Sequence, residues 1–421
     1  MKHRLFLASF AVSCLFLAGA VQPAPSQEVG PTSATVPSFR ILYQFANPTD
    51  GGGPTGRLVR DADGNLYGAG GGGPDNYGVV FKLSPGGQET VLYTFSGTDG
   101  SHPEGGLVRD AEGNLYGTTA FGGPKGYGTV FKLTPAGVLT NLHKFQGAPD
   151  GATPEADLLL DSAGNLYGTT VNGGQGCSNP YGASGCGTVF KISAEGKESI
   201  LYRFADSPDG AHPAAGLVAD QDGNLYGTTG QGGIVYAREF PLGTVFRVTP
   251  DGEETVLYRF NGSSEGDGQN PESNLVWGDN NDLYGTTANG GPNGYGTVFK
   301  LTLTGAESVL YSFPEHTGDG EFPYFSGVVR DRDGTLYGTT EAGGAETDGC
   351  AGSGCGVVYR LTPDNAESVV MSFMDTGDNG CEPISSLITD RKGNLYGSTP
   401  FCGTTGNGTI FEIRPRHDHD R

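Results

Sequence analysis

Acidic side chains recur along this chain at a fixed place in a short motif, and carboxylates of this kind can bind a cation. The motif is [DN]-G-x-x-P, and its seven copies begin at Asp50, Asp99, Asp150, Asp209, Asp267, Asp319 and Asn379. Six carboxylates from equivalent positions could supply the oxygen ligands that calcium prefers. The same residues also make turns, because Asp-Gly reverses the chain and Pro starts the next strand. We interpret the motif as turn chemistry and keep calcium at the six aspartates as the alternative; no other cofactor is expected.

Aromatic side chains lie in the glycine-rich segments that follow these motifs: Tyr77, Phe121, Tyr127, Tyr181, Tyr236, Tyr295 and Phe401. Exposed rings flanked by Asp and Asn form a surface that stacks on sugars or grips a peptide. The same rings could instead cap the packing between neighbouring repeats, and the sequence leaves both interpretations open. With the aspartates from Asp99 to Asp319, these rings are the predicted ligand-binding residues.

The sequence offers no recognisable catalytic motif. HExxH is absent, and no nucleophile is recognisably paired with a base. His102 and His212 occupy equivalent DGxHP positions, which indicates inheritance within a repeat rather than a metal pair. We therefore predict no catalytic residue.

The elements that must position these side chains repeat with the motif. Leu-Tyr-Gly recurs seven times, at the tyrosines Tyr67, Tyr116, Tyr167, Tyr226, Tyr284, Tyr337 and Tyr396. Each repeat of about 50–60 residues holds four strand-length segments bounded by Gly, Pro, Asp or Asn, and none has helical periodicity. This pattern predicts an all-β, seven-bladed β-propeller with four antiparallel strands per blade. A parallel β-helix is the alternative, although it would use much shorter repeats.

The ends of the repeat array predict how the ring closes. A VLYxF-type segment stands alone at 39–45, whereas the last repeat ends at 408–413 without one. We expect this N-terminal strand to complete the last blade, which removes an exposed sheet edge.

The N-terminus has the pattern of an export signal, with Lys2 and Arg4 before an apolar run and Ala18-Gly19-Ala20 after it. We predict a signal peptide at 1–20, a Pro/Ser/Thr-rich linker at 21–38, the propeller at 39–414 and a flexible tail at 415–421. An acylated Cys14 is a weaker alternative. The net charge of −22 argues against nucleic-acid partners. A secreted, extracellular or periplasmic monomer, not inserted in a membrane after signal cleavage, is expected.

Six cysteines remain after the signal peptide, and export to an oxidising compartment favours disulfides. Cys177 and Cys186 flank one extended loop, and Cys350 and Cys355 lie within another. Cys381 and Cys402 belong to one blade and are both expected on its loop face. These three pairs are the predicted disulfides; free thiols or a metal bound by CAGSGC are the alternatives.

The composite GLVRDxxGNLYGTTxxGG…GTVFKLTPxG…VLYxF resembles the GloVer tandem repeat of secreted bacterial proteins over about residues 39–415. It is similar, more loosely, to blades of NHL-type and gluconolactonase-type propellers. The first resemblance implies an exported repeat protein. The chain departs from anchored members because only RPRHDHDR follows the last strand, which favours free secretion.

Together these features predict a non-catalytic module that binds a glycan or an extracellular protein through its loops. The alternatives are a propeller hydrolase or lyase acting on a polysaccharide or lactone, and a structural surface component.

Overall fold

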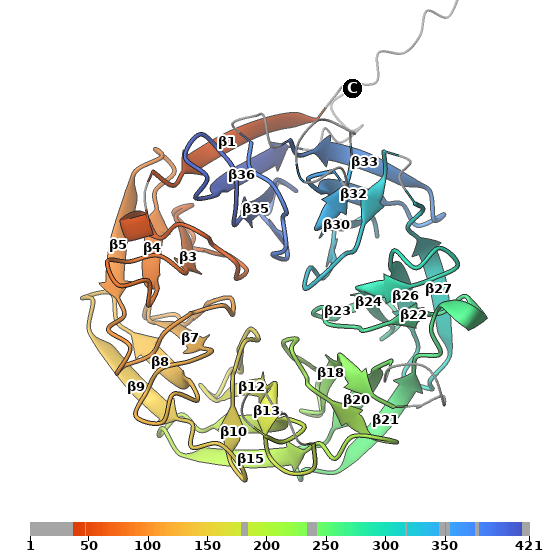
Figure 1. Cartoon of the computed structure of the whole chain (residues 1–421), viewed down its shortest axis with the longest axis horizontal. Helices are drawn as coiled ribbons and strands as arrows, with labels where there is room; N and C mark the ends of the chain where they lie inside the picture. The colour runs from red at the N-terminus through yellow and green to blue at the C-terminus, as the bar shows by residue number, and fades with distance from the viewer. Residues whose placement is uncertain are drawn as a thin grey trace, which may run out of the picture. The chain divides into compact units, whose positions relative to one another are not determined.

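The computed structural model describes residues 37–46, 48–177, 184–233, 242–315, 318–344, 350, 354–374 and 379–414. Over these residues the chain forms seven four-stranded antiparallel sheets arranged in a ring (Figure 1). The predicted seven-bladed propeller is therefore confirmed, and a parallel β-helix is excluded. The predicted signal peptide, all but the last two residues of the linker, and the tail lie outside the described residues.

Each blade contains an inner strand of two residues, two middle strands and an outer strand, in that order from the ring centre. Blades 1 to 3 are formed by β2 (Val59–Arg60), β3 (Leu66–Gly70), β4 (Val79–Leu83) and β5 (Glu89–Thr94); β6 (Val108–Arg109), β7 (Leu115–Thr119), β8 (Thr129–Leu133) and β9 (Leu139–Lys144); β11 (Leu159–Leu160), β12 (Leu166–Thr170), β14 (Thr188–Ile192) and β15 (Glu198–Arg203). Blades 4 and 5 are formed by β17 (Val218–Ala219), β18 (Leu225–Thr229), β20 (Thr244–Val248) and β21 (Glu254–Arg259); β23 (Val276–Trp277), β24 (Leu283–Thr287), β26 (Thr297–Leu301) and β27 (Glu307–Ser312). Blades 6 and 7 are formed by β29 (Val329–Arg330), β30 (Leu336–Thr340), β32 (Val357–Leu361) and β33 (Glu367–Ser372); β34 (Ile388–Thr389), β35 (Leu395–Thr399), β36 (Thr409–Arg414) and β1 (Ser38–Gln44).

Four additional two-stranded ladders, which the sequence did not predict, join the start of a repeat to the end of its second strand. They pair β10 (Gly151–Ala152) with β13 (Asn172–Gly173), β16 (Gly210–Ala211) with β19 (Gln231–Gly232), β22 (Gly268–Gln269) with β25 (Asn289–Gly290), and β28 (Gly320–Glu321) with β31 (Ala342–Gly343). The helices in the described residues are two single 3-10 turns, η1 (Pro48–Asp50) and η2 (Ser263–Glu265). Within this part of the chain, no helix has the length and hydropathy to cross a bilayer.

The core lies between neighbouring blades. The third strand of each blade is buried on both faces, because each sheet is packed between two others. In β8, Phe131 points toward blade 1, where its ring centroid lies 5.3 Å from that of Phe95, whereas Val130 packs toward blade 3 with Phe145. This is why the VFKL segment breaks the alternation of a half-exposed strand.

The glycine of Leu-Tyr-Gly makes room for this packing. Gly117 pairs directly with Phe131, and a Cβ atom at Gly117 would lie 2.8 Å from that ring and 2.8 Å from Leu107. The repetition of the motif therefore reflects one steric requirement that recurs in every blade.

Ring closure follows the prediction. Strand β1 pairs antiparallel with β36 and supplies the outer strand of blade 7 (Figure 1). A guanidinium nitrogen of Arg40 in β1 lies 2.8 Å from Oε2 of Glu412 in β36. The Phe39 ring packs against Phe373 and Phe411. The last blade is thus assembled from both ends of the repeat array.

The structure contains the three disulfides that the cysteine placement predicted: Cys177–Cys186, Cys350–Cys355 and Cys381–Cys402. The third joins the loop before β34 to the loop after β35, so both of its cysteines lie on the same face of blade 7. Because these thiols are oxidised in pairs, none is available as a thiolate ligand for a metal.

Candidate functional site

One residue position in each repeat faces the ring axis. It follows the proline of the [DN]-G-x-x-P motif, on the face that carries the loops between blades and between second and third strands; we call this the top face. The residue before the proline has a positive φ in every blade, for example 57° at His102 and 58° at Thr153. This shared backbone conformation presents the same position of each repeat toward the axis.

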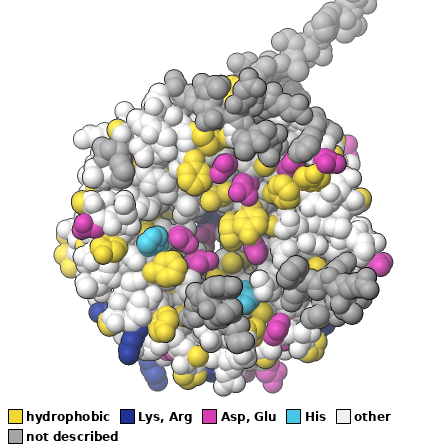
Figure 2. Space-filling view, in the orientation of Figure 1, with side chains coloured by type: hydrophobic (Ala, Val, Ile, Leu, Met, Phe, Trp, Pro, Cys, Tyr) yellow, Lys and Arg dark blue, Asp and Glu magenta, His cyan; other side chains and the backbone are white. Residues whose placement is uncertain are grey.

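The seven blades together enclose a cavity of about 290 Å³ at the top of the channel. The cavity lies on the ring axis, because every blade contributes to its lining. The contributing residues include Thr55, Glu104, Glu155, Ala214, Glu272, Phe325 and Ile384. Figure 2 shows acidic and hydrophobic side chains gathered around a depression at the centre of one face. We call Glu104, Glu155, Glu272, Tyr324 and Phe325 the mouth site.

The three mouth glutamates all have raised pKa values. Burial raises the pKa of Glu155 to about 7, and the carboxylates of Glu104 and Glu272 add to the effect. Burial also raises the pKa of Glu272 to about 7, although a hydrogen bond with the Tyr324 side chain acts in the opposite direction. The pKa of Glu104 is likewise raised by burial. Below pH 7 the site therefore contains carboxylic acids, which can donate hydrogen bonds as well as accept them.

Glu272 has an unused hydrogen-bonding atom. Its Oε2 is buried and has no partner among the described residues. A buried polar atom without a partner costs free energy, and a ligand hydroxyl could satisfy it.

A polar layer forms the floor of the mouth site. Asp157 Oδ2 lies 3.0 Å from Arg57 Nε and accepts a hydrogen bond of 2.9 Å from Asn274 Nδ2. The other oxygen of Asp157 accepts the Gly106 amide at 2.6 Å, and Asn274 Oδ1 accepts the Gly216 amide at 2.6 Å. This layer also lines a second cavity of about 510 Å³, which lies among the inner strands. It therefore links blades 1, 2, 3, 4 and 5 across the channel and separates the two cavities.

Blade 6 places two aromatic rings at the mouth. Its inner segment has one residue more than the others, because four residues separate Pro323 from Val328 whereas three separate Pro103 from Leu107. Phe325 has a φ of 55° and is 40% exposed, and the Tyr324 and Phe325 ring centroids lie 4.4 Å apart.

Sequence reasoning missed the mouth site. The available signals were the glutamates one residue after the motif proline and the single-residue insertion before Val328.

The six predicted aspartates do not converge on the axis. Each lies where one outer strand ends and the next blade begins, and its Oδ2 bonds to a side chain near the end of that strand. The partners of Asp50, Asp99, Asp150, Asp209, Asp267 and Asp319 are Tyr43, Tyr93, His143, Tyr202, Tyr258 and Tyr311. Backbone amides also bond to these carboxylates, as Gln146 and Gly151 do to Asp150. A single cation ring of these residues is therefore incompatible with the geometry, and separate ligand contacts remain a prediction.

The predicted aromatic residues divide into two groups. Tyr127 and Tyr295 pack onto the cores between blades, and Tyr77 lies over Gly97 of the loop between blades 1 and 2 although 38% of it is exposed. Phe121 and Phe401 are 44% and 50% exposed. Tyr181 and Tyr236 lie outside the described residues. The structure therefore supports the packing interpretation for the first group, whereas Phe121, although it contacts His102 edge-on, and Phe401 each expose part of the ring to solvent.

Two solved structures share the propeller fold. Virginiamycin B lyase from Staphylococcus aureus has a TM-score of 0.58 at 13% identity, covering 90% of this chain and 100% of the other. The extracellular domain of a putative hybrid two-component system from B. thetaiotaomicron has a TM-score of 0.55 at 13% identity, covering 90% of this chain and 41% of the other. At this identity the likeness shows the fold alone.

A gluconolactonase from Xanthomonas campestris is also similar, with a TM-score of 0.43 at 14% identity, covering 90% of this chain and 89% of the other. No curated protein matches the sequence. The Gloeobacter/Verrucomicrobia repeat model matches residues 31–234, 176–351 and 237–420, in agreement with the resemblance to the GloVer repeat. The chain therefore belongs to the Gloeobacter/Verrucomicrobia repeat family.

Proposed function

We propose that this protein is an extracellular binding module and that the mouth site takes the end of a neutral glycan. The cavity among Glu104, Glu155 and Glu272, with Phe325 beside them, is the observation that carries the proposal. Its volume of about 290 Å³ is near the lower limit of the ~300–1,000 Å³ typical of ligand sites, so it suits the end of a chain rather than a long segment.

The chemistry of the lining supports a ligand rich in hydroxyl groups. Glu155 and Glu272 carry protons below about pH 7 and can pair with hydroxyls as donor or acceptor. The unpartnered Glu272 Oε2 gains a hydrogen bond from such a ligand. Phe325 offers an exposed ring to the apolar face of a sugar. An anionic glycan is disfavoured, because it would meet three carboxyl groups.

An extracellular location is supported by the three disulfides, because such bonds persist in oxidising compartments. The exposed Phe121 and Phe401 would then contact more distant parts of the same ligand or a protein that carries it.

A glycan array on purified protein, followed by calorimetry with the strongest neutral ligand, tests the proposal. Phe325→Ala should weaken binding at least tenfold, equivalent to ~1.4 kcal/mol, because it removes the stacking ring. Glu155→Gln should also weaken it. The matched controls are Phe401→Ala, which removes an exposed ring outside the mouth site, and Glu253→Gln, which changes an exposed glutamate elsewhere. Binding that survives Phe325→Ala but is lost with Phe401→Ala would move the site away from the mouth.

A hydrolase or lyase is the second candidate, and one observation favours it. Glu155 and Glu272 both have a pKa of about 7, and a catalytic acid–base pair at neutral pH needs such values. A panel of polysaccharides and lactones tests this candidate. Turnover that Glu272→Gln abolishes, while Glu253→Gln leaves it unchanged, would replace the binding function with catalysis.

A further inference from the structure

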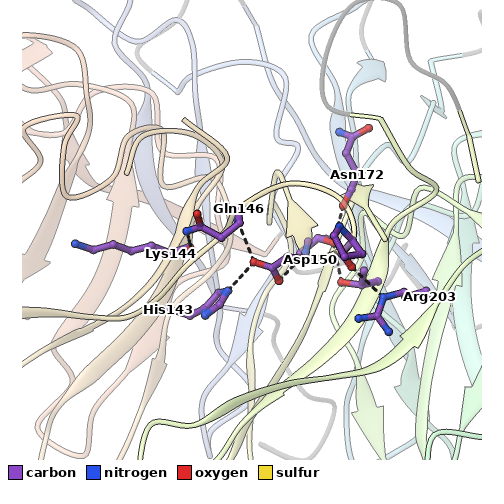
Figure 3. Close-up of polar contacts among 10 residues, drawn as sticks. His143, Lys144, Gln146, Asp150, Asn172 and Arg203 are labelled. Atoms are coloured by element: carbon purple, nitrogen blue, oxygen red, sulfur yellow. Dashed lines mark hydrogen bonds and ion pairs between the residues drawn. The ribbon is translucent and has the colours of Figure 1, made fainter. Parts of the chain in front are cut away.

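A second cluster of chemically capable side chains lies at the outer rim, away from the mouth site. His143 is near the end of β9 in blade 2, Asp150 is in the loop that enters blade 3, and Glu198 begins β15 of blade 3. One ligand atom of each lies within 4.8 Å of the others. His143 Nε2 and Asp150 Oδ2 are 3.1 Å apart and point toward one another (Figure 3). The three residues therefore meet where two blades join.

We propose that His143, Asp150 and Glu198 bind a divalent transition-metal ion, of which zinc fits best. Zinc commonly takes imidazole nitrogen and carboxylate oxygen at about 2.0–2.2 Å, which puts neighbouring ligand atoms ~3.3 Å apart. The 3.1 Å between His143 Nε2 and Asp150 Oδ2 already matches that spacing. Calcium fits less well, because it prefers ligand sets made of oxygen alone.

The surroundings hold two of the ligands in place. Asp150 accepts hydrogen bonds from the amides of Gln146 at 2.9 Å and Gly151 at 2.8 Å. The His143 ring packs edge-on against Phe145, with 4.7 Å between centroids. An ion would find this half of the site already ordered, which lowers the entropic cost of binding.

The third ligand lacks a partner. Glu198 Oε1 is buried and makes no hydrogen bond within the described part of the chain. Arg203 is the nearby positive charge, but its Nε donates to the Pro149 carbonyl at 2.9 Å (Figure 3). Two carboxylates and a neutral imidazole would balance the charge of a divalent ion and leave a coordination position for water.

The other junctions between neighbouring blades lack the histidine of this metal site. Tyrosine replaces His143 at five of them: Tyr43, Tyr93, Tyr202, Tyr258 and Tyr311. Each of these hydroxyls donates to the aspartate beside it, and a protonated phenol is a poor metal ligand. Nε2 of His143 also donates to its aspartate when no ion is bound, but a neutral imidazole can carry its proton on Nδ1 instead and so offer the Nε2 lone pair to a metal.

Zinc titration of the full-length protein by calorimetry, with and without His143→Tyr, tests the proposal. The variant carries the residue found at five other junctions, so it should fold normally. It should bind zinc at least tenfold more weakly at the rim site. His417 and His419 are present in both proteins, so binding by those residues cancels in the comparison. Equal zinc binding by both proteins would overturn the proposal. If His143→Tyr melts early in chelator, Glu198→Gln provides the same comparison.

A gain-of-site variant makes the test sharper. Tyr202 lies beside Asp209, as His143 lies beside Asp150, and Glu254 corresponds to Glu198. Tyr202→His should therefore add one zinc ion per chain. An unchanged stoichiometry would show that the three side chains are not sufficient, and displacement of zinc by equimolar calcium would contradict the choice of metal.

Discussion

Replacing Glu254 with Gln should stabilise the propeller at pH 8.5 and leave its stability at pH 5 almost unchanged. Glu254 begins β21 at a rim junction, where its Oε1 is buried without a partner among the described residues. Burial raises its pKa from 4.5 to about 7; Asp209 adds to the effect and Arg259 opposes it. Tyr202 donates to Asp209 and does not neutralise it.

The sign follows from the protons that each state binds. Between pH 4.5 and about 7 the folded state holds the Glu254 proton more tightly than the unfolded state. The stabilisation from this proton is fully present below about 4.5 and is lost as the pH rises through about 7. Glutamine keeps the size of the side chain and cannot ionise, so the variant avoids that loss.

The magnitude is set by the pKa and by exposure. A rise from 4.5 to about 7 corresponds to ~3 kcal/mol if the carboxyl were fully buried. Because this side chain is half-exposed, solvent screening leaves roughly a third, ~1 kcal/mol, which is about 2 °C in Tm. Burial and the adjoining aspartates also raise the pKa of Glu89 and Glu307 to about 7 and of Glu367 to about 8. The junctions are separate, so Gln at Glu89, Glu254 and Glu307 together should give about three times the single effect.

Differential scanning calorimetry in chelator at pH 5, 7 and 8.5 measures the effect. The control is Glu253→Gln, one residue earlier and exposed, which makes the same chemical change outside the junction. A Glu254→Gln shift that does not grow between pH 5 and 8.5 would refute the argument, because the pH dependence, rather than the size of the shift, reports ionisation.

Three further outcomes are expected. Deleting residues 21–46 should cause aggregation or much earlier melting, because it removes β1 from blade 7; unchanged melting would contradict closure by this strand. Replacing Cys381 and Cys402 with Ser should cost ~3 kcal/mol of stability for the loop they close, measured by denaturant unfolding, and non-reducing peptide mapping should find these two linked. Adding calcium to metal-free protein should leave Tm within about 2 °C, whereas saturation of a strong site would add ~2.7 kcal/mol.

The fold could be predicted from the sequence because each requirement of a blade repeats. Gly117 must leave room for Phe131. In the turn between the first two strands, the backbone amide of Asn114 donates a hydrogen bond of 2.7 Å to Asp110 Oδ1. Because the same steric and hydrogen-bonding pattern occurs seven times, the number of strands and the unpaired segment at each end of the repeat array can be recognised in the sequence. The short ladders such as β10–β13 escaped prediction, because two-residue glycine-rich strands carry no periodic signal.

The candidate sites could be predicted only in part. Asp150 was identified as a possible cation ligand, but its grouping with His143 and Glu198 depends on where β9 ends and β15 begins around the ring. The turn residues stand out in the sequence because they are shared by every repeat. The mouth glutamates occur in only three blades, and their convergence depends on the ring geometry rather than on spacing along the chain.

Both proposed sites lie where one repeat differs from the others. A residue that all repeats share makes the same contact seven times. It therefore contributes to the ring fold but does not distinguish one blade from another. Tyr324 and Phe325 enter the mouth through an insertion in blade 6, and His143 replaces a tyrosine at one junction. The junction between blades 6 and 7 differs in another way, because Met371, Asn379 and Phe39 occupy the places of Tyr, Asp and Glu. That junction is packed by aromatic contacts of Phe39. Where the two ends of the array meet, the ring therefore closes without the Asp–Glu pair that high pH would destabilise at the junctions of Glu89, Glu254, Glu307 and Glu367.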